Sequence, residues 1–97
     1  MGDKPEDLTI EYIEDGVMTV KELDKVILTK GAWCTVLYKL QSWNRAKEAY
    51  SPVAYSIRRY QKSNGEYQQR SKFNISSKDQ ATKIIEALSG WIAQKDD

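Results

Sequence analysis

Hydrophobic and polar residues alternate along much of the chain, which is the pattern of half-buried β-strands. Residues 8–13 alternate weakly, and residues 25–30 form a short strand-like run that ends before a glycine. Residues 17–23 fit either a return strand or the start of the next element. The long run 32–43 is rich in β-branched and aromatic residues, and its even-numbered side chains form the more continuous apolar face. The first half of the chain is therefore expected to be β-structure.

The clearest alternation covers residues 53–62 and 66–75, on either side of the step Asn64-Gly65. Asparagine and glycine both tolerate positive φ, so this step predicts a tight hairpin turn. Strict alternation in the two strands then places a set of basic and aromatic side chains on one surface of the hairpin, opposite its apolar side: Arg58, Tyr60, Lys62, Arg70 and Lys72.

The period changes after the hairpin, where apolar residues recur with the spacing of an amphipathic helix over residues 78–93. Ser77 is a typical N-cap, and Gln80 stands three residues later, as in a capping box. The apolar side chains of this helix are Ala81, Ile84, Ile85, Leu88, Trp91 and Ile92.

Strands followed by one helix, without βαβ alternation, indicate an α+β fold. We expect an antiparallel, curved sheet of four or five strands, followed by one C-terminal amphipathic helix. Residues 1–7 are expected to be a disordered acidic tail, and residues 8–97 a single domain. One helix covers one face of a sheet, so the other face must be solvated, bound to a partner, or both.

Charge is distributed unevenly, although the net charge is only +1. Residues 1–24 hold two lysines against eight carboxylates, whereas residues 25–78 hold eleven Lys or Arg against two glutamates. This pattern fits either internal charge balance on a solvated surface or a polyanion-binding face flanked by acidic ends. A mobile acidic start would compete with phosphates for the same cations; if residues 8–13 are a strand, deleting them would instead destabilise the fold.

Composition argues against an enzyme. The chain has no histidine and a single cysteine, Cys34, so a His-based triad, an intrachain disulfide and a zinc site built from its thiols are excluded. Cys34 lies in an apolar run, where a buried structural role competes with a reactive thiol. Glu48 and Glu66 are isolated, and there is no Gly-rich phosphate loop. We expect no catalysis, no cofactor, no metal and no small-molecule substrate.

The sequence also lacks a signal peptide and any apolar run approaching a membrane span. These features predict a cytoplasmic protein, nucleoid-associated if it is bacterial, with no membrane partner.

Aromatic residues make the polyanion interpretation more specific, because eight of the ten rings lie between Trp33 and Phe73 among the basic residues. Cations for phosphates and rings for unpaired bases are what a single-stranded nucleic acid requires. Trp33 and Trp43 share a strand face with Lys39, where a core or dimer contact competes with base stacking. The candidate nucleic-acid-binding residues are Lys39, Trp43, Arg58, Arg59, Tyr60, Lys62, Arg70 and Lys72.

Three segments occur in order before the amphipathic helix: Tyr55-Ser56-Ile57-Arg58-Arg59-Tyr60, Asn64-Gly65-Glu66 and Lys72-Phe73-Asn74-Ile75-Ser76. Together with the helix they resemble the transcriptional positive-cofactor-four family, in particular its small bacterial members. Asn74 stands where the family usually has glycine, and Ser77 where it often has leucine. The resemblance covers a core of residues 26–92.

This resemblance implies a homodimer formed largely through the helix, with single-stranded DNA bound along the curved sheets. Leu88, Trp91 and Ile92 are then candidates for the dimer interface. Together the features predict a non-enzymatic protein that binds single-stranded DNA, with RNA also possible, and with little sequence preference. Such a protein could act as an accessory factor in transcription or replication. The alternative is a protein-interaction or assembly module that uses the exposed sheet face or edge.

Overall fold

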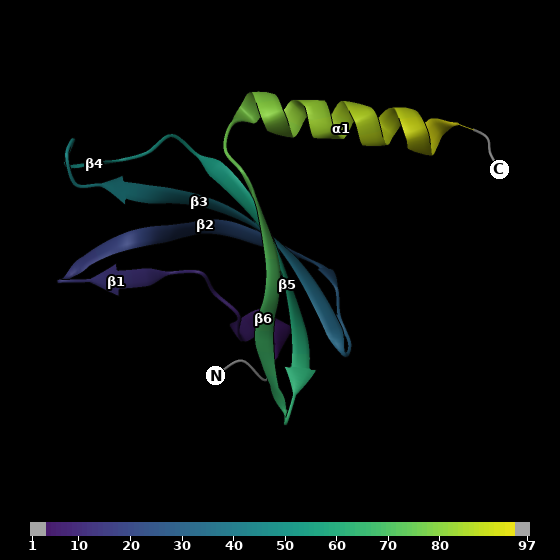
Figure 1. Cartoon of the computed structure of the whole chain (residues 1–97), viewed down its shortest axis with the longest axis horizontal. Coiled ribbons are helices and arrows are strands. Elements are labelled where there is room, and N and C mark those ends of the chain that lie inside the picture. The colour runs from purple at the N-terminus through teal and green to yellow at the C-terminus, as the bar shows by residue number, and fades with distance from the viewer. Residues whose placement is uncertain (1–3, 95–97) are drawn as a thin grey trace.

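A computed structural model describes residues 4–94 of the chain. The fold is α+β: a curled antiparallel sheet, open like half a barrel, is followed by one C-terminal helix (Figure 1). This confirms the predicted class, although the sheet has six strands rather than four or five. The elements are a 3-10 turn at Pro5–Asp7, β1 Tyr12–Glu14, β2 Val17–Thr29, β3 Trp33–Asn44, β4 Ala49–Tyr50, β5 Ala54–Ser63, β6 Glu66–Ile75 and α1 Lys78–Ala93.

Neighbouring strands follow the chain closely, in the order β1-β2-β3-β5-β6, with the short β4 paired to the end of β3. The two early runs that the sequence separated, 17–23 and 25–30, form one thirteen-residue strand, β2. Two bulges interrupt its pairing with β3, one between Glu22 and Asp24 and one between Ile27 and Thr29. These irregularities explain why the alternation is weak there, because each bulge changes which face the following side chains occupy.

The register divides the sheet into two faces, since directly paired residues share a face. Cys34 pairs with Tyr60, Val36 with Arg58, and Tyr38 with Ser56. We call the face that carries these six residues the strap face. The opposite side, the helix face, carries the pairs Leu37–Ile57 and Tyr55–Ile75 and lies toward α1.

The core lies on the strap face, where residues 5–10, the N-terminal strap, cover the middle of the sheet. Leu8 and Ile10 of the strap are 7% and 8% exposed and cluster with Cys34, Val36, Tyr38 and Tyr60, of which the first three are fully buried. The expected disordered tail is therefore wrong for residues 5–7, which form the 3-10 turn that leads into this contact. Residues 1–3 of that expected tail lie outside the described residues.

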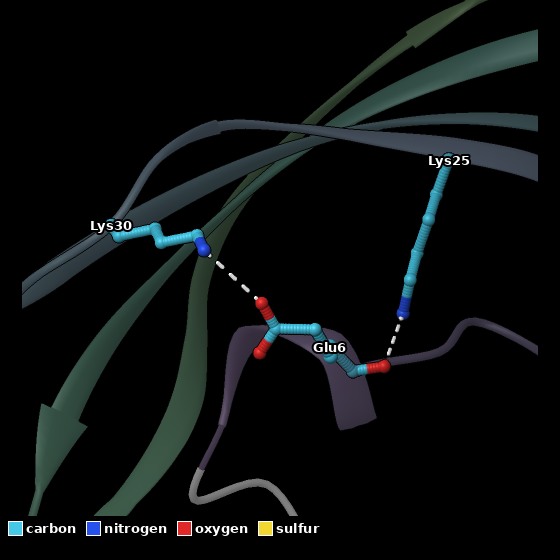
Figure 2. Close-up of polar contacts among 3 residues, drawn as sticks. All are labelled: Glu6, Lys25 and Lys30. Carbon is cyan, nitrogen blue, oxygen red and sulfur yellow. Dashed lines mark hydrogen bonds and ion pairs between the residues drawn. The ribbon is translucent and has the colours of Figure 1, made fainter.

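Two lysines of β2 and the following turn fix the strap to the sheet (Figure 2). Lys25 donates from its Nζ to the backbone carbonyls of Glu6, at 2.9 Å, and of Leu8. Lys30 forms an ion pair with the Glu6 carboxylate at 3.1 Å. A hydrogen bond from its own backbone N–H, and then the Lys30 ammonium, hold the pKa of Glu6 below its ordinary value. The apolar contact of Leu8 is thus accompanied by polar anchors at Glu6 and at the Leu8 carbonyl.

The helix begins as the sequence predicts, but it packs loosely on the sheet. The Ser77 Oγ accepts the backbone N–H of Gln80 at 3.2 Å, and the Gln80 side chain accepts the N–H of Ser76 at 3.0 Å. None of the residues of α1 is buried. A hollow of about 570 Å³ separates the apolar side of α1 from Leu28, Leu37 and Ile57 of the helix face. In Figure 1 the helix begins beyond the end of β6 and extends to the right, past the strands of the sheet.

Candidate nucleic-acid interface

Three of the predicted cations lie on the strap face. Arg58 on β5 pairs directly with Lys72 on β6, and Lys62 follows on the same face, paired with Tyr67. Arg58 is half-buried, and the other two cations are exposed. Among residues 4–94 the ion pairs are those of Lys30 and Arg45, so neither Arg58 nor Lys72 has a carboxylate partner there. Like charges directly opposite each other on two strands repel.

A chain of side-chain hydrogen bonds orients Arg58. Its Nε donates to the Ser56 Oγ at 2.9 Å, and its Nη1 donates to the Gln69 Oε1 at 3.0 Å. The fully buried Ser56 donates in turn to the Asn74 Oδ1 at 2.8 Å. These bonds use two of the five N–H donors of the guanidinium and fix its plane. Sequence reasoning placed Ser56 and Asn74 on the polar side of the hairpin but did not identify this network.

Tyr60 is a core residue, which corrects the expectation that its ring stacks on bases. It is 6% exposed, lies in the cluster with Leu8 and Ile10, and shares a hydrogen bond of 2.9 Å with the Tyr38 hydroxyl. The ring was assigned to a solvated face because it alternates with basic residues. The strap covers that part of the face, and no feature of residues 53–62 alone indicates it.

Arg70 does not join the other hairpin cations, which corrects the predicted alignment of five side chains. The register of β5 and β6 shifts because Arg59 pairs with Ser71 whereas Tyr60 pairs with Gln69, leaving Arg70 as the extra residue of a bulge. The Arg70 Nε donates to the Gln61 Oε1 at 3.2 Å. Gln61 pairs with Trp33 and therefore belongs to the helix face.

The remaining predicted binding residues also lie on the helix face. Arg59 places its guanidinium 4.5 Å from the ring centroid of Trp33. Trp43 contacts Tyr50 edge-on at 5.1 Å between ring centroids, and Lys39 is exposed opposite Tyr55. The eight predicted residues are thus divided between two faces. A single strand lying on one face contacts only part of the set.

The predicted dimer residues lie on the exposed part of α1. Leu88, Trp91 and Ile92 are 48%, 67% and 79% exposed. Their role in a dimer stays a prediction. Cys34 is fully buried, and burial raises the pKa of its thiol, as expected for a structural rather than a reactive cysteine.

The buried tyrosine pair makes stability sensitive to alkaline pH. Burial raises the pKa of both Tyr38 and Tyr60 above the ordinary value of 10.0. In the unfolded chain both phenols lose their protons near pH 10, whereas in the folded chain they retain them. The unfolded state then binds fewer protons, so stability falls as pH rises through that range.

We expect the melting temperature to drop between about pH 9 and 11. Comparing wild type with the Tyr38→Phe/Tyr60→Phe double variant over that range measures the effect. The melting temperature of the variant, which has no buried phenol at these positions, should fall less over this pH range. Equal slopes of melting temperature against pH in the two proteins would contradict the role given to the buried tyrosine pair.

Comparison of the chain with family models, with curated proteins and with solved structures gave no match. The resemblance to the positive-cofactor-four family therefore stays a prediction. Within residues 4–94, His, Cys, Asp and Glu side chains form no group of three or more suited to a metal ion. In the same part of the chain, no helix is long and apolar enough to cross a membrane.

Proposed function

We propose that this protein binds single-stranded nucleic acid through the strap face, with single-stranded DNA as the first candidate ligand. The observation that carries the proposal is the cross-strand pair Arg58–Lys72, which has no carboxylate partner among the described residues. A phosphate backbone supplies the missing negative charge. Lys62 lies on the same face of β5 but on the other side of the strap-covered Tyr60, so the proposed phosphate contact rests on Arg58 and Lys72.

The expected mode is non-catalytic and has little sequence preference, because phosphate contacts carry no sequence information. The cytoplasmic setting and an accessory role in transcription or replication belong to the same proposal. A duplex and an RNA of the same length, tested beside the DNA, distinguish the ligand classes.

The binding face is tested by removing its cations in matched pairs. In the Arg58→Ala/Lys72→Ala variant we expect affinity for fluorescent oligo(dT) at low salt to fall at least about tenfold. Two lost phosphate contacts should reduce the slope of log K against log salt by about 1.4. The control, Arg70→Ala/Lys83→Ala, removes the same charge from outside the strap face. Fluorescence anisotropy at several salt concentrations measures both.

Equal losses of affinity for oligo(dT) in the two variants would show that binding depends only on net charge and would contradict a site on the strap face. Wild type that fails to bind any single strand at low salt would contradict the proposed function itself.

The helix face favours a second role, the assembly of two copies. Large apolar residues are exposed both on the sheet, where Val26, Leu28 and Phe73 are about half exposed, and along α1. The chain thus presents both an apolar hollow of about 570 Å³ and an apolar helix end. Two copies related by a twofold axis can cover both features at once, since such an interface uses the same patch twice. We propose a homodimer on this face, which leaves the strap face of each copy free.

A further inference from the structure

A second hollow, of about 430 Å³, lies beyond the area that the strap covers; most of its lining belongs to the strap face, and Tyr55 and Ile75 of the helix face also contribute. Its apolar walls come from three strands and the loop before β5: Val20, Leu40, Pro52 and Ala54. Its volume falls in the range of small-ligand sites, roughly 300–1,000 Å³. The hollow is thus large enough to hold a flat ring.

Polar groups line the rim of this hollow, and they include the cationic pair. Arg58, Lys72 and Asn74 stand on one side, and Ser42 and Ser51 on the other. Arg58 and Asn74 belong to the hydrogen-bond chain through Ser56, so this side of the rim is held in place. An apolar floor beside two uncompensated cations matches a ligand that combines a flat apolar body with an anionic group.

The opposite rim is also preformed. The Ser51 Oγ accepts the backbone N–H of Ser42 at 3.0 Å and donates to the carbonyl of Pro52 at 2.9 Å. The Gln41 side chain donates to the Ser51 carbonyl at 3.0 Å. These bonds attach the loop before β5 to the end of β3, so the hollow does not depend on the ligand to form.

We propose that this hollow receives one unstacked base of the bound strand, with the adjoining phosphate between Arg58 and Lys72. The inference rests on the proposed function and deepens it. Tyr60, two residues from Arg58 and on the same face, is buried beneath the strap and offers no face for stacking. The apolar hollow beside the proposed phosphate site supplies the contact with a base that the buried Tyr60 ring cannot make.

The test separates the base from the phosphate. Oligo(dT) is compared with an abasic strand of the same length, which keeps the phosphates and lacks the bases. Wild type should prefer oligo(dT) about tenfold, the scale of one base held against protein. The Ala54→Phe variant fills the floor of the hollow and should lose most of this preference while keeping the salt dependence. Ala49→Phe, at the exposed residue of β4, is the matched control and should behave as wild type.

The outcomes distinguish the inference from the proposed function. Wild type that binds both strands equally well would overturn the base site while leaving phosphate binding intact. A second result would also overturn the base site and leave phosphate binding intact. In it, Arg58→Ala/Lys72→Ala loses binding to both strands while Ala54→Phe binds them like wild type. If Ala54→Phe fails to fold, as judged by its melting curve, Ser42→Phe fills the hollow from its rim. Wild type that binds neither strand would overturn the proposed function and the base site together.

Discussion

Replacing Leu8 and Ile10 with alanine should remove most of the stability of this protein. Both side chains are more than nine-tenths buried against Tyr38 and Tyr60. Truncating a buried leucine or isoleucine to alanine costs about 2–5 kcal/mol. The total stability of a small domain is only about 5–15 kcal/mol. We therefore expect the double variant to be largely unfolded at 37 °C, or to melt far below wild type.

Urea denaturation followed by tryptophan fluorescence measures the loss. The matched control is Ile13→Ala/Leu23→Ala, which truncates two apolar side chains that are 62% and 38% exposed. The control should stay close to wild type. Deleting residues 1–10 should resemble the double variant and should weaken nucleic-acid binding at every salt concentration. A truncated chain that remains folded and binds more tightly at low salt would instead favour the competing acidic tail.

Placing a carboxylate in the hollow under α1 should convert a dimer into a monomer. Leu88 lines this hollow beside Ile85, and both residues are about half exposed or more in one copy. If a second copy covers them, Leu88→Glu buries an unpaired charge in the interface, which costs several kcal/mol. Light scattering at tens of micromolar should give about twice the 11.2 kDa chain mass for wild type and the chain mass for Leu88→Glu.

The control for this variant is Lys83→Glu, which places a carboxylate on the opposite side of the same helix. It should remain dimeric, because position 83 does not line the hollow. Circular dichroism should show a folded chain in both variants. A wild-type protein with monomer mass at this concentration would contradict the dimer, whatever the variants do.

Local sequence signals predicted the hairpin of β5 and β6 and the C-terminal helix. The Asn64-Gly65 step forms the hairpin turn, with φ of 54° at Asn64 and 82° at Gly65, and Ser77 caps the helix. These features depend on residues that are close in sequence. The strap does not, because Leu8 meets Tyr60 across about fifty residues and no local pattern marks that contact.

The candidate site was harder to predict, because assigning a side chain to a face of the sheet requires counting residue positions along each strand. A period of two assigns each side chain to a face only while the pairing is regular. The single extra residue at Arg70 inverts the assignment for the earlier part of β6, so Gln69 and Tyr67 lie on the strap face. Arg58 and Lys62 keep their predicted face because β5 has no extra residue, and Lys72 keeps its face because it follows the bulge in β6.

The bulge also bears on whether two copies of this protein pair edge to edge. β6 is the last strand of the sheet and pairs only with β5 along residues 4–94, so ten residues present a free edge. Such an edge is a template for a further strand. The extra residue twists this edge, and Arg70 and Lys72 would meet the same charges on an approaching copy. Pairing of two copies through their β6 edges is therefore disfavoured, while the helix face stays available for a closed pair.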